Sequence, residues 1–144
     1  MTLPEWITLF LRNKDMMKQQ ILHVEEKGHI IHITLKGEKK QDSFCYEKLG
    51  DLTEVLAAAK KSDNDPSYSV NVVCYNTPAN LQMLIDHWQQ FAIHQRVMFY
   101  FVNPKSMTDI KWIVNPWLHN RIGDEKSLVP GLKSMASMVE EWKG

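Results

Sequence analysis

The first eleven residues carry apolar side chains at helical spacing. Residues three to four positions apart share a face of a helix, so one packing stripe is expected from Trp6, Ile7, Phe10 and Leu11. Thr2 stands three residues before Glu5, with a proline inside the first turn, which is typical of a capping box. The pattern predicts a helix at the start of the chain.

Polar and apolar residues alternate from Gln19 to Lys48, so the period changes from that of a helix to that of a strand. Turn-forming glycines at Lys27-Gly28 and within residues 37–40 divide this stretch into three parts. The last part is centred on residues 43–46. The pattern predicts a hairpin that continues into a three-stranded antiparallel meander.

Two strand-like runs, residues 68–75 and 97–102, flank a helical pattern at residues 77–94. Thr77 followed by proline is a strong signal for the start of that helix. A strand, a helix and a second strand in this order predict a βαβ unit, with parallel neighbouring strands and a right-handed crossover.

Further helices are expected at three places. Asp51 with Glu54 resembles a second capping box, residues 116–122 fit a short helix, and Ser127 opens an amphipathic pattern that reaches Trp142. Residues 110–114 fit one more strand. The order of elements predicts an α/β (α+β mixed) fold: a mixed sheet with an N-terminal antiparallel meander and a βαβ unit, and helices on both faces.

No linker, repeat or low-complexity tract divides the chain, so residues 1–144 are expected to form a single globular domain. Lysine plus arginine (17) equals aspartate plus glutamate (17), which leaves no net field to hold a polyanion. We therefore expect a protein partner or a homo-oligomer, and neither a nucleic acid nor a membrane. No apolar run is long enough for a membrane span, and a soluble protein is expected.

Cys45 and Cys74 are the only cysteines, and each has apolar or aromatic neighbours in a strand-like segment. Such residues are typical of buried free thiols in a reducing compartment. The sequence predicts reduced, buried cysteines and a cytoplasmic location.

The sequence motifs of common catalytic chemistry are absent. The six glycines form no G-x-G-x-x-G or P-loop pattern, and G-x-S-x-G, H-E-x-x-H and C-x-x-C are missing. No catalytic residue can be assigned, no cofactor is expected, and whether the protein is an enzyme stays open.

His23 and His32 would face each other if Lys27-Gly28 were a two-residue hairpin loop. Two imidazoles at about 5 Å between Cβ atoms could supply half of a metal site. A half-exposed polar face with two histidines is the favoured interpretation, and no metal site is predicted.

Charged residues follow the second and third predicted strands, at Glu38-Lys39-Lys40, Asp42 and Glu47-Lys48. Together with the order helix, three strands, helix, strand, they resemble the restriction-endonuclease-like nucleases, in which such groups hold a divalent ion. Those nucleases place the carboxylates on strands in P-D and D/E-x-K patterns, whereas here no Pro-Asp precedes the pair. Solvated turn charges are the favoured interpretation.

Polar residues end both strands of the predicted βαβ unit, at Asn76-Thr77 and Asn103-Pro104. Ligands of open parallel sheets gather outside the carboxyl ends of strands, near helix N-termini. Asn76, Thr77 and Asn103 are therefore candidate ligand-binding residues. Ordinary capping and turn chemistry is the alternative.

The segment 111–121 combines two tryptophans with a histidine, asparagines and an arginine. Trp117, His119 and Arg121 are candidate ligand-binding residues, and we expect residues 115–121 to converge with Asn76 and Asn103 at one edge of the sheet. Tryptophan and arginine also carry much of the energy of protein interfaces. Tryptophans that fill the core are the alternative.

Two classes of function remain. A binding or assembly module with an aromatic-rich surface is favoured, because motifs of common chemistry are absent while five tryptophans and eight methionines are present. The alternative is a small-ligand-binding protein or enzyme with a site at the carboxyl ends of the parallel strands. A divalent-metal, nuclease-like domain ranks third.

Overall fold

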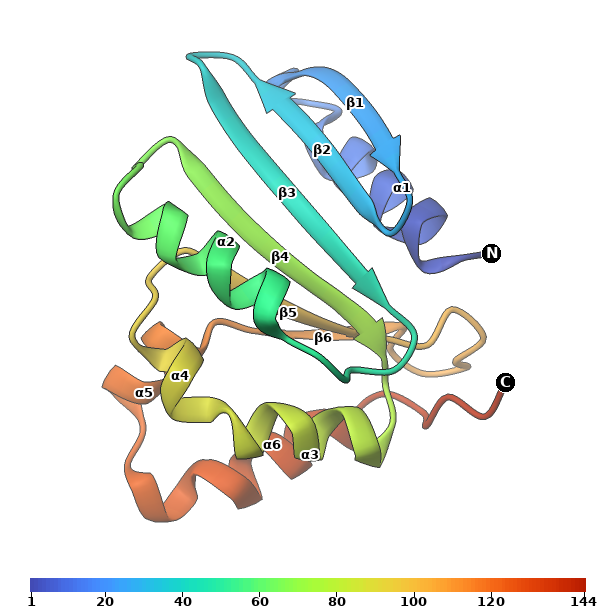
Figure 1. Cartoon of the computed structure of the whole chain (residues 1–144). Coiled ribbons are helices and arrows are strands. Elements are labelled where there is room, and N and C mark those ends of the chain that lie inside the picture. Colours follow the sequence, from blue (N-terminus) through green and yellow to red (C-terminus); the bar gives the residue numbers. More distant parts are fainter.

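The structure, a computed structural model, describes all 144 residues. Its centre is one six-stranded mixed sheet whose strand order follows the chain from β1 to β6 (Figure 1). The first three strands form the predicted antiparallel meander, β3 to β5 are parallel, and β6 is antiparallel to β5. The strands are β1 (Ile21–Lys27), β2 (Ile30–Leu35), β3 (Lys39–Tyr46), β4 (Tyr68–Tyr75), β5 (Val97–Val102) and β6 (Lys111–Val114).

Helices cover both faces of this sheet, which confirms the predicted fold class. Of the helices, only α1 packs on one face, and the later helices cover the other (Figure 1). The helices are α1 (Leu3–Asp15), α2 (Thr53–Asp63), α3 (Pro78–Asp86), α4 (Trp88–Ala92), α5 (Pro116–Ile122) and α6 (Leu128–Ala136), with a short 3-10 helix η1 (Glu125–Ser127) before α6. No helix has the length and apolar character needed to cross a membrane.

The central strand β4 explains why two apolar cores form. Val72 and Val73 have no exposed surface although they point to opposite faces of the sheet. A strand that is buried on both faces carries a nearly continuous apolar run, as this one does. Cys45 and Cys74 lie in the two cores as unpaired thiols, which confirms the prediction for both.

The βαβ prediction is confirmed, because β4 and β5 are parallel neighbours. The helix between them is broken into α3 and α4 at His87, whose ring Nδ1 lies 2.8 Å from the carbonyl oxygen of Met83. Thr77 caps α3 by accepting a hydrogen bond from the backbone N–H of Asn80.

Three helix ends test the capping predictions. The capping box of Thr2 with Glu5 is present. The box expected at Asp51 is wrong, because Leu52 is the N-cap residue of α2 and makes no side-chain bond. Ser127 likewise provides no side-chain cap for α6.

The last helix ends at Ala136 and does not reach Trp142 as predicted. Tertiary contacts stop it: Asn76 donates to the carbonyl oxygens of Ala136 and Val139, and Val139 forms a bridge with Asp109. Residues 137–138 form a turn, and the chain then crosses the carboxyl end of the sheet. We call residues 137–142 the C-terminal strap.

Candidate functional site

β1 and β6 form the two edges of the sheet. At β6, the backbone N–H of Asn103 donates to the carbonyl oxygen of Ile110 at 2.7 Å. Hydrogen-bonded and non-hydrogen-bonded residue pairs alternate along an antiparallel ladder. This bond therefore determines which residue pairs of β5 and β6 are hydrogen-bonded to each other. Lys111 and Ile113 consequently direct their backbone N–H and C=O groups away from β5. No strand of the chain pairs with these groups.

A groove of about 180 Å³ lies between α1 and this edge. Trp6 and Phe10 stack in it with ring centroids 5.2 Å apart, and both meet the ring of Tyr100 edge-on. Trp6 and Tyr100 are buried and Phe10 is half-buried, so the interlocked rings form a rigid apolar floor of the groove. The groove is lined by Trp6, Leu9, Phe10, Asn13, Ile110 and Lys111.

Exposed apolar side chains extend the groove along the loop before β6. Leu9 is 48% exposed and Ile110 is 44% exposed. Met107 and Met138 are exposed further along, where the hydroxyl of Thr108 donates to the Met138 carbonyl oxygen at 3.3 Å. Flexible methionines are common on surfaces that bind other proteins.

One cation stands at the mouth of the groove. Lys111 Nζ lies 5.0 Å from the centroid of the Phe10 ring, and it takes part in none of the ion pairs of the chain. Burial raises the pKa of the Tyr100 hydroxyl to about 12, so the ring beneath the groove stays neutral at physiological pH. The groove is therefore apolar, with one unpaired positive charge.

The structure brings Asn76, Thr77 and Asn103 together at the carboxyl end of the sheet, where the backbone N–H of Asn76 donates to the carbonyl oxygen of Val102. The Asn76 side chain is fully engaged within the chain. Its Nδ2 lies 3.0 Å from the carbonyl oxygen of Val139, and its Oδ1 accepts from the Trp112 indole at 2.8 Å.

Asn103 is engaged in the same way. Its Nδ2 donates to the carbonyl oxygen of Glu140 at 2.9 Å, and its Oδ1 accepts from the backbone N–H of Lys105. Trp142 at the end of the strap stacks on Tyr75 with ring centroids 4.0 Å apart. The side chains of Asn76 and Asn103 thus bind the C-terminal strap, and a cavity of about 470 Å³ lined by Asn76 remains between α3, α6 and the strap.

The expected convergence of residues 115–121 with Asn76 and Asn103 is wrong. Because β6 is antiparallel to β5, α5 begins at the amino end of β5, and Asn115 donates to the carbonyl oxygen of Gln95 there. The chain order alone did not reveal that the sixth strand reverses direction. The six candidate residues therefore belong to two distant places.

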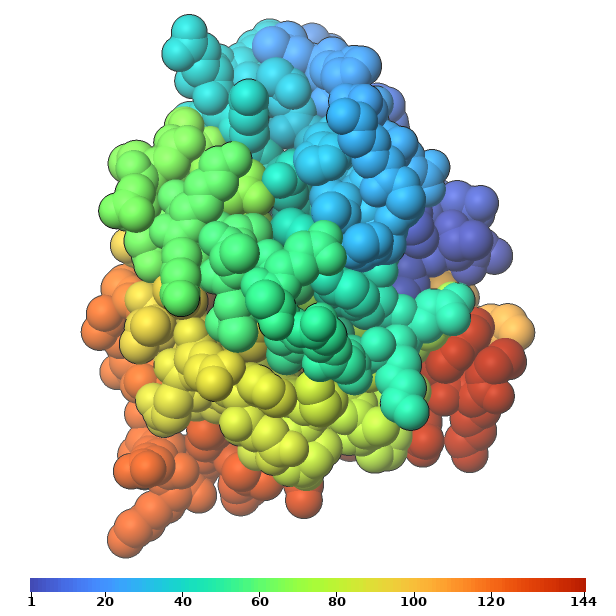
Figure 2. All heavy atoms as spheres, viewed as in Figure 1, coloured from blue at the N-terminus to red at the C-terminus, as the bar shows by residue number.

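The second place is α5, which packs on α4 through the edge-on contact of His119 with Trp88. Arg121 stacks on Trp117, with its guanidinium carbon 3.9 Å from the ring centroid. Figure 2 shows the orange residues of α5 and of the segment after it at the left and lower left of the molecule. Ile122, the last residue of α5, is 78% exposed. Trp112, by contrast, is a core residue stacked on Phe101.

The predicted pairing of His23 with His32 is also wrong. Lys27 pairs with Ile30, so Gly28 and His29 form the loop. The register of β1 against β2 therefore differs by two residues from the predicted one. Gly28 and not Lys27 has the positive φ of 61° that such a turn requires. His32 lies opposite Glu25, and its Nδ1 is 2.7 Å from a carboxylate oxygen of Asp42.

The residues behind the nuclease resemblance are dispersed. Glu38 lies in the β2–β3 turn with a φ of 59°, and Asp42 is bound by His32 and by the Tyr68 hydroxyl at 2.7 Å each. Glu47-Lys48 follow the far end of β3. No group of three or more His, Cys, Asp or Glu side chains is placed to hold a metal ion.

Sequence reasoning missed a polar pocket of about 390 Å³ at the carboxyl end of β3. His29 Nε2 lies 3.1 Å from both carboxylate oxygens of Glu54, and the Tyr46 hydroxyl donates to the same carboxylate at 3.4 Å. Burial, followed by the charge of Glu54, raises the pKa of Tyr46. His29 and Glu54 are 25 positions apart in the chain, so only the position of Tyr46 at a strand end could have pointed to this pocket.

Comparison of the chain with protein-family models, with curated proteins and with solved structures finds no match in any of the three.

Proposed function

We propose that the protein is a binding module that takes up an extended segment of a partner protein as a seventh strand beside β6. One observation carries the proposal: the outward backbone groups of Lys111 and Ile113 lie next to an apolar groove. Strand addition uses such a combination, in which backbone hydrogen bonds give affinity and pockets for alternate side chains give specificity.

The groove defines the side chains that the partner should carry. Alternate residues of the added strand would point to the α1 face, because side chains alternate across a strand. They would meet Leu9 and Phe10 in the groove, which favours apolar residues. Lys111 has no acidic partner within the chain and favours one carboxylate in the segment.

A second copy of this chain is the less suitable occupant. Pairing β6 with β6 would bring Lys111 of both copies, each without an acidic partner, into the same short interface. Like charges across an interface lower its stability. A segment with an apolar, acidic, apolar alternation complements the groove better.

Selection of displayed heptapeptides on the wild-type protein provides the test, followed by calorimetry of the selected peptide. Ile113→Pro removes an outward N–H without removing a β5–β6 hydrogen bond, and Ile113→Ala is its matched control for lost packing. We expect at least tenfold weaker binding to Ile113→Pro than to Ile113→Ala.

Two results would contradict the proposal. Equal binding to both variants would exclude strand addition at β6. A wild-type dimer at micromolar concentration that dissociates in Ile113→Pro would assign the edge to self-association and not to a partner.

A second candidate function is binding of a small ligand in the pocket of His29, Tyr46 and Glu54. The pocket supports it because it combines a cavity, convergent polar groups and a perturbed pKa at the carboxyl end of a parallel strand. A thermal-shift screen should then find a compound that stabilises the wild type and not His29→Ala. A screen without any such compound would leave the strand-addition proposal alone.

A further inference from the structure

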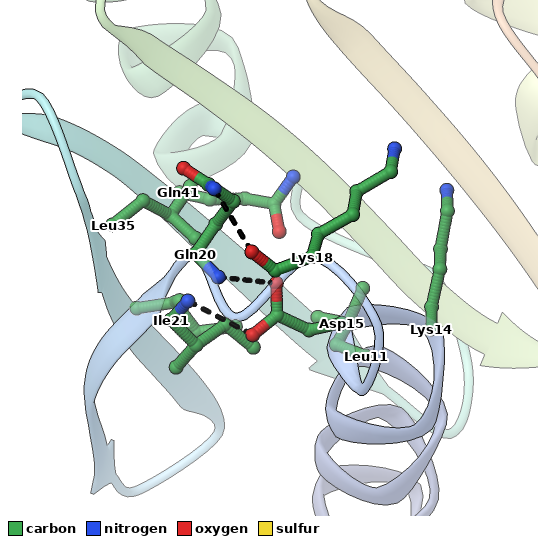
Figure 3. A pocket seen from close by; sticks show the side chains of 9 residues that line it. Leu11, Lys14, Asp15, Lys18, Gln20, Ile21, Leu35 and Gln41 are labelled. Carbon is green, nitrogen blue, oxygen red and sulfur yellow. Dashed lines mark hydrogen bonds between the residues drawn. The ribbon is translucent and has the colours of Figure 1, made fainter.

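A separate hollow of about 230 Å³ lies between the end of α1, the following turn and the strands β2 and β3 (Figure 3). Four apolar side chains form its walls: Leu11, Ile21, Ile33 and Leu35. The hollow and the β6 groove use different flanks of α1. The hollow is lined by Leu11, Lys14 and Asp15 of α1, and the groove by Trp6, Leu9, Phe10 and Asn13. The two sets are offset by five residues, which is about 140° around a helix of 3.6 residues per turn.

The only acidic residue of the hollow is already engaged. The two carboxylate oxygens of Asp15 accept the backbone N–H groups of Gln20 and Ile21, each at 2.9 Å (Figure 3). These bonds hold the tight turn in which Gln19 has a φ of 50°. Asp15 therefore closes the turn.

Two lysines of the hollow have no acidic partner. Neither Lys14 nor Lys18 takes part in an ion pair. Figure 3 shows the Lys14 side chain extending from the end of α1 and the Lys18 side chain extending in a similar direction from the following turn, with the amide of Gln41 on the same side. Gln41 uses one N–H toward the Ser69 hydroxyl at 3.3 Å, and a primary amide has a second one to donate.

We infer that this hollow binds a small amphipathic carboxylate. The apolar part would lie on Leu11, Ile33 and Leu35, and the carboxylate would lie between the two ammonium groups, with the Gln41 amide as a further donor. At about 30 Å³ for each water-sized group, the volume accommodates roughly eight non-hydrogen atoms. Hexanoate has this size and this chemistry.

Lys14 also lies in the last turn of α1, and Lys18 follows the helix end by three residues, where positive charges offset the helix dipole. That role requires charge only and no apolar wall. A ligand that needs both the carboxylate and the tail separates the two explanations.

The experiment is an NMR titration with hexanoate that follows the methyl signals of Ile33 and Leu35, with hexanol and hexylamine as controls of the same tail length. Hexanoate should bind at least tenfold more tightly than either control. The double variant Lys14→Gln with Lys18→Gln should weaken hexanoate binding about tenfold and leave hexanol unchanged. Lys60→Gln with Lys126→Gln removes the same charge from the far side of the sheet and should change nothing.

Equal binding of hexanoate and hexanol would overturn the inference, as would equal weakening by both double variants. Either result is independent of the β6 proposal, because no residue of the β6 groove is altered.

Discussion

The two edge strands of the sheet meet solvent in different ways. β1 has seven residues, of which only Ile21 and Val24 are even half-buried, and it ends in the charged run Glu25-Glu26-Lys27. β6 has four residues, and its alternate side chains, Trp112 and Val114, are buried. The β1 edge of the sheet is therefore mostly polar and exposed, whereas β6 packs its alternate side chains into the core.

This difference shows how the fold handles its open edges. Charged residues on an edge strand discourage pairing with another chain, and β1 has them in abundance. β6 has only Lys111 for that purpose, and an apolar groove lies beside it. Charged residues therefore follow the β1 edge, and an apolar groove follows the β6 edge.

Among variants that test this difference between β1 and β6, Trp112→Ala should cause the largest loss in the free energy of unfolding. The Trp112 ring stacks on Phe101 with centroids 4.3 Å apart, and the indole donates to Asn76. Truncation of a buried tryptophan costs about 3–5 kcal/mol of the free energy of unfolding. Urea unfolding measures it, with Val24→Ala on β1 as the control at under about 1.5 kcal/mol. Equal losses would show that the core supports both edges alike.

Asn76→Ala should cause the second-largest loss of stability. The substitution leaves the Trp112 indole and the carbonyl oxygens of the C-terminal strap without their buried partner, at about 1–3 kcal/mol for such a group. Asp15→Ala is the counterpart near β1, where the accepted bonds are more exposed and the loss should be smaller. Thermal unfolding of both variants decides. A larger loss for Asp15→Ala would reverse the comparison.

The pH dependence of stability should report on Tyr100 beneath the β6 groove. Burial raises the pKa of its hydroxyl from 10.0 to about 12. Between these values the unfolded chain releases the proton and the folded chain keeps it, so stability falls as the pH rises from 10 toward 12. Tyr100→Phe should lose less stability over that range, by up to about 2 kcal/mol. Identical slopes for wild type and variant would contradict the assignment.

Lys27→Ala on β1 should have the smallest effect. Its ion pair with Glu25, at 3.4 Å, is exposed on both sides. Exposed pairs contribute about 0–1 kcal/mol, so the unfolding midpoint should hardly move. Chemical denaturation checks this, and a loss above about 1 kcal/mol would show that the β1 edge depends on its charges for more than solubility.

Much of the candidate site was outside the reach of sequence reasoning. The aromatic-rich surface was expected around residues 111–121, but Trp112 lies in the core and the groove uses Trp6 and Phe10 of the first helix. Those two residues were identified from the sequence only as a packing stripe. Helical spacing shows that residues share a face, and it does not show what covers that face.

The sequence by itself determined the elements whose signals are local. The capping box at Thr2, the meander, the βαβ unit and the burial of both cysteines follow from the spacing and types of neighbouring residues. The tertiary structure decided the direction of β6, the end of the last helix and the partners of Asn76, because each depends on contacts between residues that are 9 to 63 positions apart. Such contacts depend on how the whole chain packs around its two cores, and local residue patterns do not encode them.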